Sequence, residues 1–192
     1  MTNPDELLAE YLAEHVTKRH RKRAMREDLR RRIDINKGDS GNVVKEVSAY
    51  LEDKPMVRVV AVYSALPGEA DLSTLVSRGG KIWVFPKVVG EDLYFFQVLN
   101  LKEDLEFGAF GILEPKEGLR EYDASQIDLF LCPGLGFDVR GGRIGRGRGF
   151  YDRVLSKARA GALKVGVCFG FQLVEDVATE PHDIRMNCVI AG

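Results

Sequence analysis

The run V-R-V-V-A-V-Y at residues 57–63 is almost wholly apolar. A strand of this kind is buried on both faces, which is typical of a parallel sheet covered by helices. A helix is predicted over residues 72–77, and a second apolar run follows at residues 81–85. The order strand, helix, strand indicates parallel pairing. The sequence therefore predicts an α/β fold with three layers, α/β/α, around a mostly parallel sheet.

Periodicity and breakers place the remaining elements. An N-terminal helix over residues 4–35 carries an apolar stripe (Met25, Leu29 and Ile33) that we expect to face the body. At 192 residues, the chain is expected to form one domain, 1–192, in which residues 1–35 pack on the α/β body. Further helices are predicted at 43–51, at 150–158 and around 172–176, further strands at 93–99 (antiparallel, near an edge), 127–132, 163–169 and 188–191, and an irregular segment at 107–115.

Charge and composition exclude several classes of protein. The formal net charge is -1, although residues 18–32 hold nine Lys or Arg against two acids, so we expect no nucleic-acid partner. No apolar run approaches membrane-spanning length, and no secretory signal is recognised at the N-terminus. The three cysteines lie in or beside apolar runs and lack metal-ligand spacing, which favours buried thiols, with a catalytic role left open. We expect a cytoplasmic protein without a membrane partner.

A segment rich in glycine and arginine follows the strand predicted at 127–132. Residues 134–149 hold seven of the twenty glycines and four arginines. Glycine lets successive backbone N–H groups face one anion, and a helix that begins at residue 150 adds positive charge. The pattern predicts a phosphate-binding loop, which fits neither the Walker nor the dinucleotide spacing. A flexible linker or an RNA-binding tail is the alternative.

Ligands in open α/β sheets bind beyond the carboxyl ends of the strands. This rule places four segments on one rim: residues 64–71, 107–115, the glycine-rich segment and 180–183.

The run P-G-L-G-F-D-V-R-G-G-R-I-G-R-G-R-G-F-Y-D at residues 133–152 resembles the signature of the 5-formyltetrahydrofolate cyclo-ligase family. The run K-R-A-M-R-E-D-L-R at residues 22–30 also resembles the N-terminal motif of that family. The resemblance implies cyclisation of 5-formyltetrahydrofolate to 5,10-methenyltetrahydrofolate, with ATP as co-substrate and Mg²⁺ as cofactor. It also implies that reduced folate and ATP are the partners, and we expect a monomer or a weak homodimer.

The family's functional residues can be carried over position by position. Arg146, Arg148 and Tyr151 would be catalytic. Lys22 and Arg26 lie beside the apolar stripe of the first helix, whereas Arg23 falls further round; a solvated basic face is the alternative for such cations. The ATP-binding set implied by the resemblance is Lys22, Arg23, Arg26, Arg143, Ile144, Gly145, Arg146, Gly147, Arg148, Gly149, Phe150 and Tyr151.

The resemblance also implies a metal site and a folate site. Asp152 and Asp183 would hold Mg²⁺; without the resemblance they read as a first-turn acid and a loop acid. The folate would contact Ser64, Glu69, Phe110, Arg146 and Phe150, although Phe110 and Phe150 also suit a core.

The chain departs from the family pattern at two single positions and at Met186-Asn187-Cys188, where the family usually has Val-Asp. Leu72 stands where relatives usually have threonine, and Arg148 where many have lysine. Leu72 and the divergent middle of the chain, residues 91–126, leave open a relative that acts on another N-acyl or folate-like substrate. The basic first helix and the segment rich in glycine and arginine leave open a non-catalytic nucleotide- or RNA-binding protein.

Overall fold

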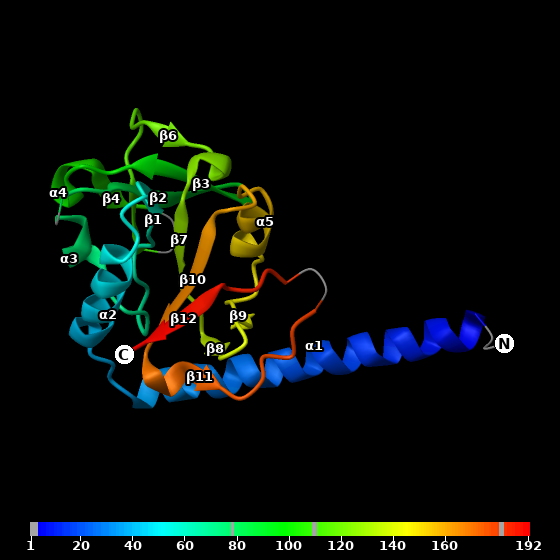
Figure 1. The fold of residues 1–192 in the computed structure, drawn as a ribbon. Helices are drawn as coiled ribbons and strands as arrows, with labels where there is room; N and C mark the ends of the chain where they lie inside the picture. The colour runs from blue at the N-terminus through cyan, green and yellow to red at the C-terminus, as the bar shows by residue number, and fades with distance from the viewer. Residues whose placement is uncertain (1–3, 78, 109–110, 181–182) are drawn as a thin grey trace.

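The computed structural model describes residues 4–77, 79–108, 111–180 and 183–192. Its centre is a seven-stranded sheet (Figure 1). In sheet order the first five strands run parallel to one another, and each of the last two pairs antiparallel with the strand before it. The predicted mostly parallel sheet is confirmed. In sheet order the strands are β12 (Cys188–Ala191), β10 (Leu163–Cys168), β7 (Leu129–Cys132), β1 (Val59–Ala61), β2 (Ile82–Val89), β3 (Asp92–Gln97) and β6 (Glu121–Tyr122).

Helices cover both faces of the sheet. The strand β7 shows how this happens, because its successive side chains point to opposite faces. Leu129 and Leu131 join the core beneath α2 (Ser40–Glu52) and α3 (Ser73–Val76). Phe130 and Cys132 join the core beneath α5 (Phe150–Ser156). The predicted three-layer arrangement is therefore confirmed.

The N-terminal helix α1 (Pro4–Ile35) crosses one end of the body, and its N-terminal part projects beyond it (Figure 1). Leu29 is fully buried, and Met25 and Ile33 pack against the same small core, which also contains Leu135 and Ile144. The predicted apolar stripe is confirmed. This packing holds α1 against the glycine-rich segment.

Several short elements complete the fold, and one of them differs from the sequence prediction. The segment expected to be irregular at 107–115 contributes to a hairpin of β4 (Leu105–Phe107) and β5 (Leu113–Pro115). Each strand has only three residues, and their pattern does not alternate clearly between apolar and polar positions, so the sequence did not reveal the pairing. The other small elements are α4 (Leu101–Asp104), η2 (Ala124–Gln126), η3 (Gly170–Gln172), and a three-stranded sheet of β11 (Leu173–Val174), β8 (Gly136–Asp138) and β9 (Arg143–Ile144).

The helix predicted around residues 172–176 was wrong, because that region forms a 3-10 turn and a short strand. Gln172 explains the difference. Its buried side chain accepts a hydrogen bond from the Phe169 N–H at 2.8 Å and donates to the carbonyls of Gly134 and Leu135 at 3.0 and 3.1 Å. These tertiary hydrogen bonds override the local helix preference.

Buried thiols account for two of the cysteines. Cys132 and Cys168 are buried, and Cys188 is partly buried; all three are free. Burial raises the pKa of both Cys132 and Cys168 to about 12, so neither is a thiolate nucleophile near neutral pH. Within the described part of the chain, no helix has the length and apolar character that crossing a bilayer requires.

Candidate active site

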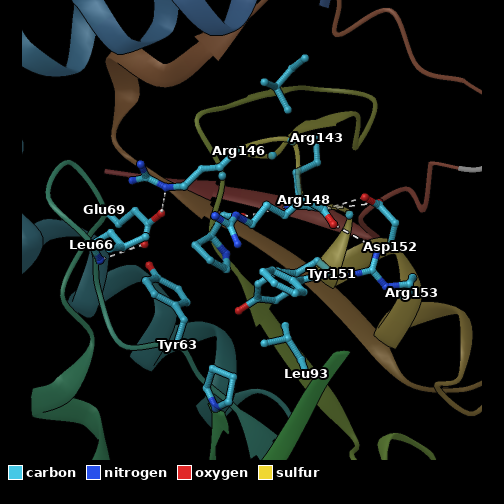
Figure 2. A pocket seen from close by; sticks show the side chains of 18 of the residues that line it. Tyr63, Leu66, Glu69, Leu93, Arg143, Arg146, Arg148, Tyr151, Asp152 and Arg153 are labelled. Carbon is cyan, nitrogen blue, oxygen red and sulfur yellow. Dashed lines mark hydrogen bonds and ion pairs between the residues drawn. The ribbon is translucent and has the colours of Figure 1, made fainter. Parts of the chain in front are cut away.

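A cavity of about 860 Å³ lies at the carboxyl ends of β1 and β7 (Figure 2). All four segments that the sequence placed on one rim contribute to its wall, which confirms that prediction. Cationic groups from α1 and the glycine-rich segment line one part of the cavity. Apolar side chains from the sheet and the β4–β5 hairpin line another part: Pro86, Val88, Leu93 and Ile112.

The glycine-rich segment is folded and anchored, which excludes a flexible tail. The buried Asp138 carboxylate accepts hydrogen bonds from the N–H groups of Arg140, Gly142 and Val177 at 2.9, 2.9 and 3.0 Å. Burial acts to raise the pKa of Asp138, but these donors lower it below its ordinary value. The ionised carboxylate therefore fixes the turn that leads into β9 and the following arginines.

Arg26 reaches the glycine-rich segment from α1. Its Nε donates to the Gly145 carbonyl at 3.0 Å. At Gly147, φ is +104°, a conformation that side chains other than glycine rarely adopt, and a Cβ there would lie 3.8 Å from Arg26 Nε. Because Gly147 has no side chain, the backbone of the loop stays accessible next to the Arg26 guanidinium from α1.

Arg143 is buried in the wall of the cavity and organises three neighbours. Its Nη2 lies 3.3 Å from both carboxylate oxygens of Asp152, and its Nη1 donates to the Pro133 carbonyl at 3.3 Å. Its guanidinium lies 5.2 Å from the centre of the Tyr151 ring. Burial raises the pKa of Tyr151 well above its ordinary value, so the phenol stays protonated and can donate a hydrogen bond.

Glu69 and Arg146 form a second ion pair across the cavity. Arg146 Nε donates to Glu69 Oε1 at 3.1 Å, and the Leu66 N–H donates to Glu69 Oε2 at 3.0 Å (Figure 2). Burial raises the pKa of Glu69, although these two donors act to lower it. Beside it, the buried Tyr63 hydroxyl donates to the Ala70 carbonyl at 2.8 Å and fixes the loop that follows β1.

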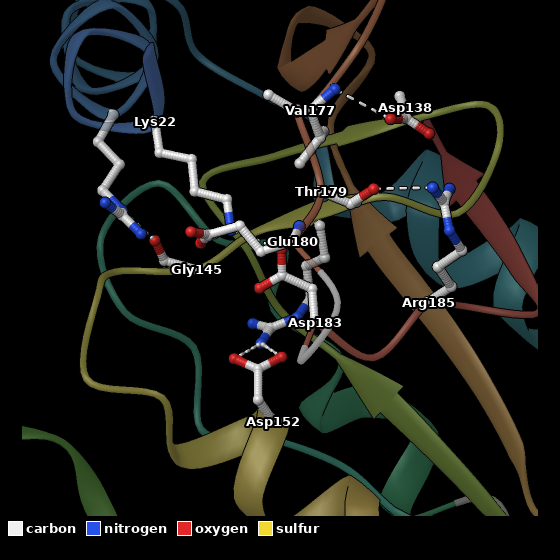
Figure 3. A network of polar contacts seen from close by, with 12 residues as sticks. Lys22, Asp138, Gly145, Asp152, Val177, Thr179, Glu180, Asp183 and Arg185 are labelled. Carbon is white, nitrogen blue, oxygen red and sulfur yellow. Dashed lines mark hydrogen bonds and ion pairs between the residues drawn. The ribbon is translucent and has the colours of Figure 1, made fainter. Parts of the chain in front are cut away.

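Lys22 extends from α1 to two acids near the C-terminus (Figure 3). Its Nζ lies 2.6 Å from Glu180 Oε2 and 2.5 Å from Asp183 Oδ2, and all three side chains are largely buried. Asp183 also accepts a hydrogen bond from the Glu180 N–H at 2.6 Å. The helix and the segment before β12 are thus joined at the wall of the cavity.

The sequence profile of the 5-formyltetrahydrofolate cyclo-ligase family matches residues 17–192. The chain belongs to this family.

Individual relatives agree with this result. "5-formyltetrahydrofolate cyclo-ligase" from Mycoplasma pneumoniae is 27% identical over 178 residues, which cover 88% of this chain and 97% of that protein. A "probable 5-formyltetrahydrofolate cyclo-ligase" from Schizosaccharomyces pombe is 29% identical over 127 residues, 59% of this chain and 62% of that relative. The solved structure of 5,10-methenyltetrahydrofolate synthetase from Aquifex aeolicus has a TM-score of 0.77 at 32% identity, with 88% of this chain and 89% of that chain covered.

In this cyclo-ligase family member, the structure brings together most of the residues carried over from the family motif. One cavity is lined by Lys22, Arg26, Ser64, Glu69, Arg143, Ile144, Gly145, Arg146, Gly147, Arg148, Gly149, Phe150, Tyr151, Asp152 and Asp183.

Two of the remaining positions lie away from this cavity, and a third is outside the described residues. Arg23 does not line this cavity; its side chain is 81% exposed and faces Glu27. Phe110 lies outside the described residues. Leu72, the departure from the family pattern, is buried in the core beneath α2 and α3 and is not part of the cavity wall.

Sequence reasoning missed several residues of the wall. Glu114, Glu180 and Arg153 line the cavity but were not assigned roles. Glu180 opens one of the rim segments, and Arg153 directly follows the glycine signature, so position alone pointed to both. Glu114 follows three apolar or glycine positions in G-I-L-E-P, and an acid in such a run was the signal available.

Proposed function

We propose that this protein is an ATP- and Mg²⁺-dependent enzyme that cyclises 5-formyltetrahydrofolate to 5,10-methenyltetrahydrofolate and releases ADP and phosphate. The observation that supports it best is the division of one cavity into a cationic glycine-rich side and an apolar side with a buried carboxylate. A triphosphate suits the first side and a reduced pterin suits the second. Names of the relatives point to the same reaction.

The chemistry explains why both substrates must share one cavity. The formyl oxygen on N5 is an amide oxygen and a poor leaving group. Its attack on the γ-phosphorus of ATP releases ADP and makes the oxygen part of a phosphate ester. N10 then attacks the formyl carbon, loses its proton and closes the ring, and phosphate leaves with the former formyl oxygen. Such transfer depends mainly on positioning and on positive charge around the phosphoryl group.

The cationic residues divide this task between them. We assign Arg146 and Arg148 to the transferred phosphoryl group because both line the cavity on the loop. Arg26 and the backbone of Gly145, Gly147 and Gly149 would bind the phosphates. Tyr151 would donate its protonated hydroxyl to a substrate oxygen, since burial holds its pKa well above neutral pH. Arg143 would act chiefly by orienting Asp152.

The carboxylates of Asp152 and Asp183 are suitable ligands for a magnesium ion. Both line the cavity, and both offer the hard oxygen donors that Mg²⁺ prefers. Among the described residues there is no group of three or more acids, histidines and cysteines that could hold a metal. Mg²⁺ takes one or two carboxylates and completes its shell with phosphate oxygens and water. When bound, it would neutralise charge on the phosphates.

The folate would lie on the apolar side. Phe150 offers a flat aromatic face and Leu93 an aliphatic side chain to the pterin, and Glu69 offers a carboxylate acceptor. The Ser64 hydroxyl donates to the Leu113 carbonyl at 2.5 Å, so we assign Ser64 to shaping this side of the cavity. We further propose that the enzyme acts in the cytoplasm as a monomer or a weak homodimer.

A continuous absorbance assay tests this function. Purified protein is mixed with Mg-ATP and 5-formyltetrahydrofolate, and methenyl absorbance and ADP are followed together. We expect equal amounts of methenyl product and ADP, and no product when ATP or Mg²⁺ is omitted. ATP turnover only with a different N-formyl compound would instead support the related substrate, and absence of any turnover would contradict the proposal.

A further inference from the structure

Arg153 reaches from α5 to two segments that carry parts of the cavity wall. It directly follows the signature at residues 133–152, and its own side chain lines the cavity. Its Nη1 donates to the Arg148 carbonyl, on the glycine-rich segment, at 3.1 Å. Its Nη2 donates to the Glu91 carbonyl, in the turn between β2 and β3. One guanidinium therefore connects the glycine-rich segment to the β2–β3 hairpin.

The contact with Arg148 fixes a peptide plane that we assign to phosphate binding. The carbonyl of Arg148 and the N–H of Gly149 belong to the same rigid plane, so a donor on the carbonyl also fixes the direction of the N–H. At Gly149, φ is +68°, and a Cβ there would lie 3.0 Å from Arg153 Nη1. The Arg153 N–H also donates to the Gly149 carbonyl at 3.0 Å. Arg153 thus holds the last turn of the glycine-rich segment from both ends of its side chain.

The contact with Glu91 fixes the hairpin that supplies the apolar wall. Val88 and Leu93 pair in register two positions from the turn, and both line the cavity. Figure 2 shows Leu93 and Arg153 in the same wall. Next to the turn, Arg153 Nε lies 3.6 Å from Asp92 Oδ1. The position of the hairpin, and with it the apolar side of the cavity, therefore depends on the same side chain as the glycine-rich segment.

Charge alone does not account for these contacts. The side chains of Arg153 and Asp92 are 41% and 40% exposed, and an ion pair of this kind contributes little to stability. Lys157 already places a cation 3.7 Å from the same carboxylate oxygen of Asp92. The two carbonyl contacts use the planar fork of donors that arginine has and lysine lacks. The guanidinium also lies 5.4 Å from the centre of the Phe150 ring, which we place against the pterin.

We propose that Arg153 is a positioning residue that sets the alignment of the γ-phosphate with the formyl oxygen. It holds the Gly149 peptide, the Phe150 ring and the β2–β3 hairpin in one arrangement. This inference rests on the proposed function and adds a residue to which the resemblance gave no role. Phosphoryl transfer depends mainly on alignment, and a displacement of about 1 Å can cost about 100-fold in rate. Loss of Arg153 therefore slows turnover more than it weakens binding of either substrate.

Arg153→Met and Lys157→Met form a matched pair. Both cations lie near Asp92, but only Arg153 contacts the two carbonyls and lines the cavity. We expect Arg153→Met to lower kcat about 30-fold or more, with the KM for ATP and for 5-formyltetrahydrofolate each within about threefold of wild type. Its thermal midpoint should stay within about 3 °C of wild type. Lys157→Met should keep kcat within about twofold.

Arg153→Lys separates geometry from charge. It keeps a cation near Asp92 but loses the fork, so kcat should remain at least about tenfold below wild type. Recovery of the wild-type kcat by lysine would overturn the inference. So would a rise in both KM values accompanied by a thermal midpoint more than about 10 °C lower, because that result marks a residue needed only for folding.

Amide hydrogen exchange without substrates tests the contact itself. Residues 88–93 and 145–149 should both exchange faster in Arg153→Met than in wild type, because one side chain restrains both segments. Lys157→Met should match wild type in both segments. Unchanged exchange in either segment of Arg153→Met would overturn the inference.

The outcomes also separate this inference from the proposed function. If wild type forms methenyl product and Arg153→Met forms it at the same rate, only the inference about Arg153 fails. If wild type forms no methenyl product, the proposed function fails, and the role of Arg153 in turnover fails with it. The exchange comparison then still decides whether Arg153 holds the two segments together.

Discussion

Lys22 Nζ lies 2.5 Å from Asp183 Oδ2, although the two residues are 161 positions apart in sequence. The contact joins α1 to the segment that precedes β12, and the Lys22 side chain is only 7% exposed. Lys22 also belongs to the ATP-binding set that the resemblance implies, and Asp183 is one of the two residues that we assign to magnesium. Nucleotide and metal would therefore bind where a cation and two acids already meet.

Replacing Lys22 with methionine should destabilise the fold, because it leaves Glu180 and Asp183 buried without this cation. Removing one partner of a buried ion pair costs about 3–5 kcal/mol in the free energy of unfolding. The KM for ATP should also rise by at least tenfold. Urea unfolding and ATP-dependent kinetics measure the two effects.

Arg19 on the same helix is exposed and provides the control. Arg19→Met should change the free energy of unfolding by no more than about 0.5 kcal/mol. Equal stability of the Lys22→Met and Arg19→Met variants would show that the buried pair contributes nothing.

Asp152→Asn should reduce turnover far more than it reduces folate binding. The amide removes a negative charge that Mg²⁺ needs and weakens the contact with Arg143. We expect kcat to fall by about 100-fold or more, while calorimetry gives a folate Kd within twofold of wild type. Asp34 is exposed, so Asp34→Asn is the control and should keep the kcat of the wild type. Full activity in Asp152→Asn would rule out the metal assignment.

Glu69→Gln should make the protein more stable near pH 7. Burial raises the pKa of Glu69, so its ionised form costs folding free energy, and one unit of such a shift corresponds to about 1.4 kcal/mol. As the pH falls through this raised pKa toward the ordinary value of 4.5, wild type takes up the proton first in the folded state and gains stability. The difference between the two proteins should then shrink.

Urea unfolding of the wild type and of Glu69→Gln at several pH values measures the difference in their free energy of unfolding and shows whether it has the expected sign. A variant that is less stable than wild type at pH 7 would mean that the ion pair with Arg146 outweighs burial. Activity should fall in the same variant, which separates the functional role of Glu69 from its effect on stability.

Asp138→Asn should have the opposite effect. The folded pKa of Asp138 is lowered, so its contribution to stability is present above the ordinary value of 3.8 and is lost as the pH falls through the folded pKa. Asparagine cannot accept all three backbone hydrogen bonds, and we expect a loss of about 1–3 kcal/mol at pH 7. Denaturant titrations from pH 7 to pH 3 should show this loss shrinking below about pH 4; a loss independent of pH would indicate altered packing instead.

The fold was predictable where burial follows from local periodicity. The stripe of Met25, Leu29 and Ile33 and the apolar runs of β1 and β7 each identify their buried faces without distant contacts. The boundaries were less accurate, because β2 continues to Val89 as it pairs with β3. The two strands are joined by a two-residue turn, Gly90-Glu91, which is a local hairpin signal that the sequence analysis did not use.

The site residues that lie within a continuous sequence motif could be predicted, whereas those brought in by tertiary contacts were harder to recognise. Residues 143–152 carry both the glycine spacing and the arginines, and they line the cavity. Lys22 and Arg23 are neighbours of the same charge, yet one is buried against Asp183 and the other is exposed. Glu114 had only a weak signal, an acid in an apolar run, because its burial depends on the pairing of β5 with β4 and on how Ser64 and Lys87 hold the neighbouring carbonyls.

The most direct test of the account is a structure of the complex with Mg²⁺, a non-hydrolysable ATP analogue and 5-formyltetrahydrofolate. We expect the triphosphate to lie on the glycine-rich segment between Arg143 and Gly149, with the γ-phosphate beside the formyl oxygen. A triphosphate bound elsewhere, with this segment contacting no nucleotide, would contradict it.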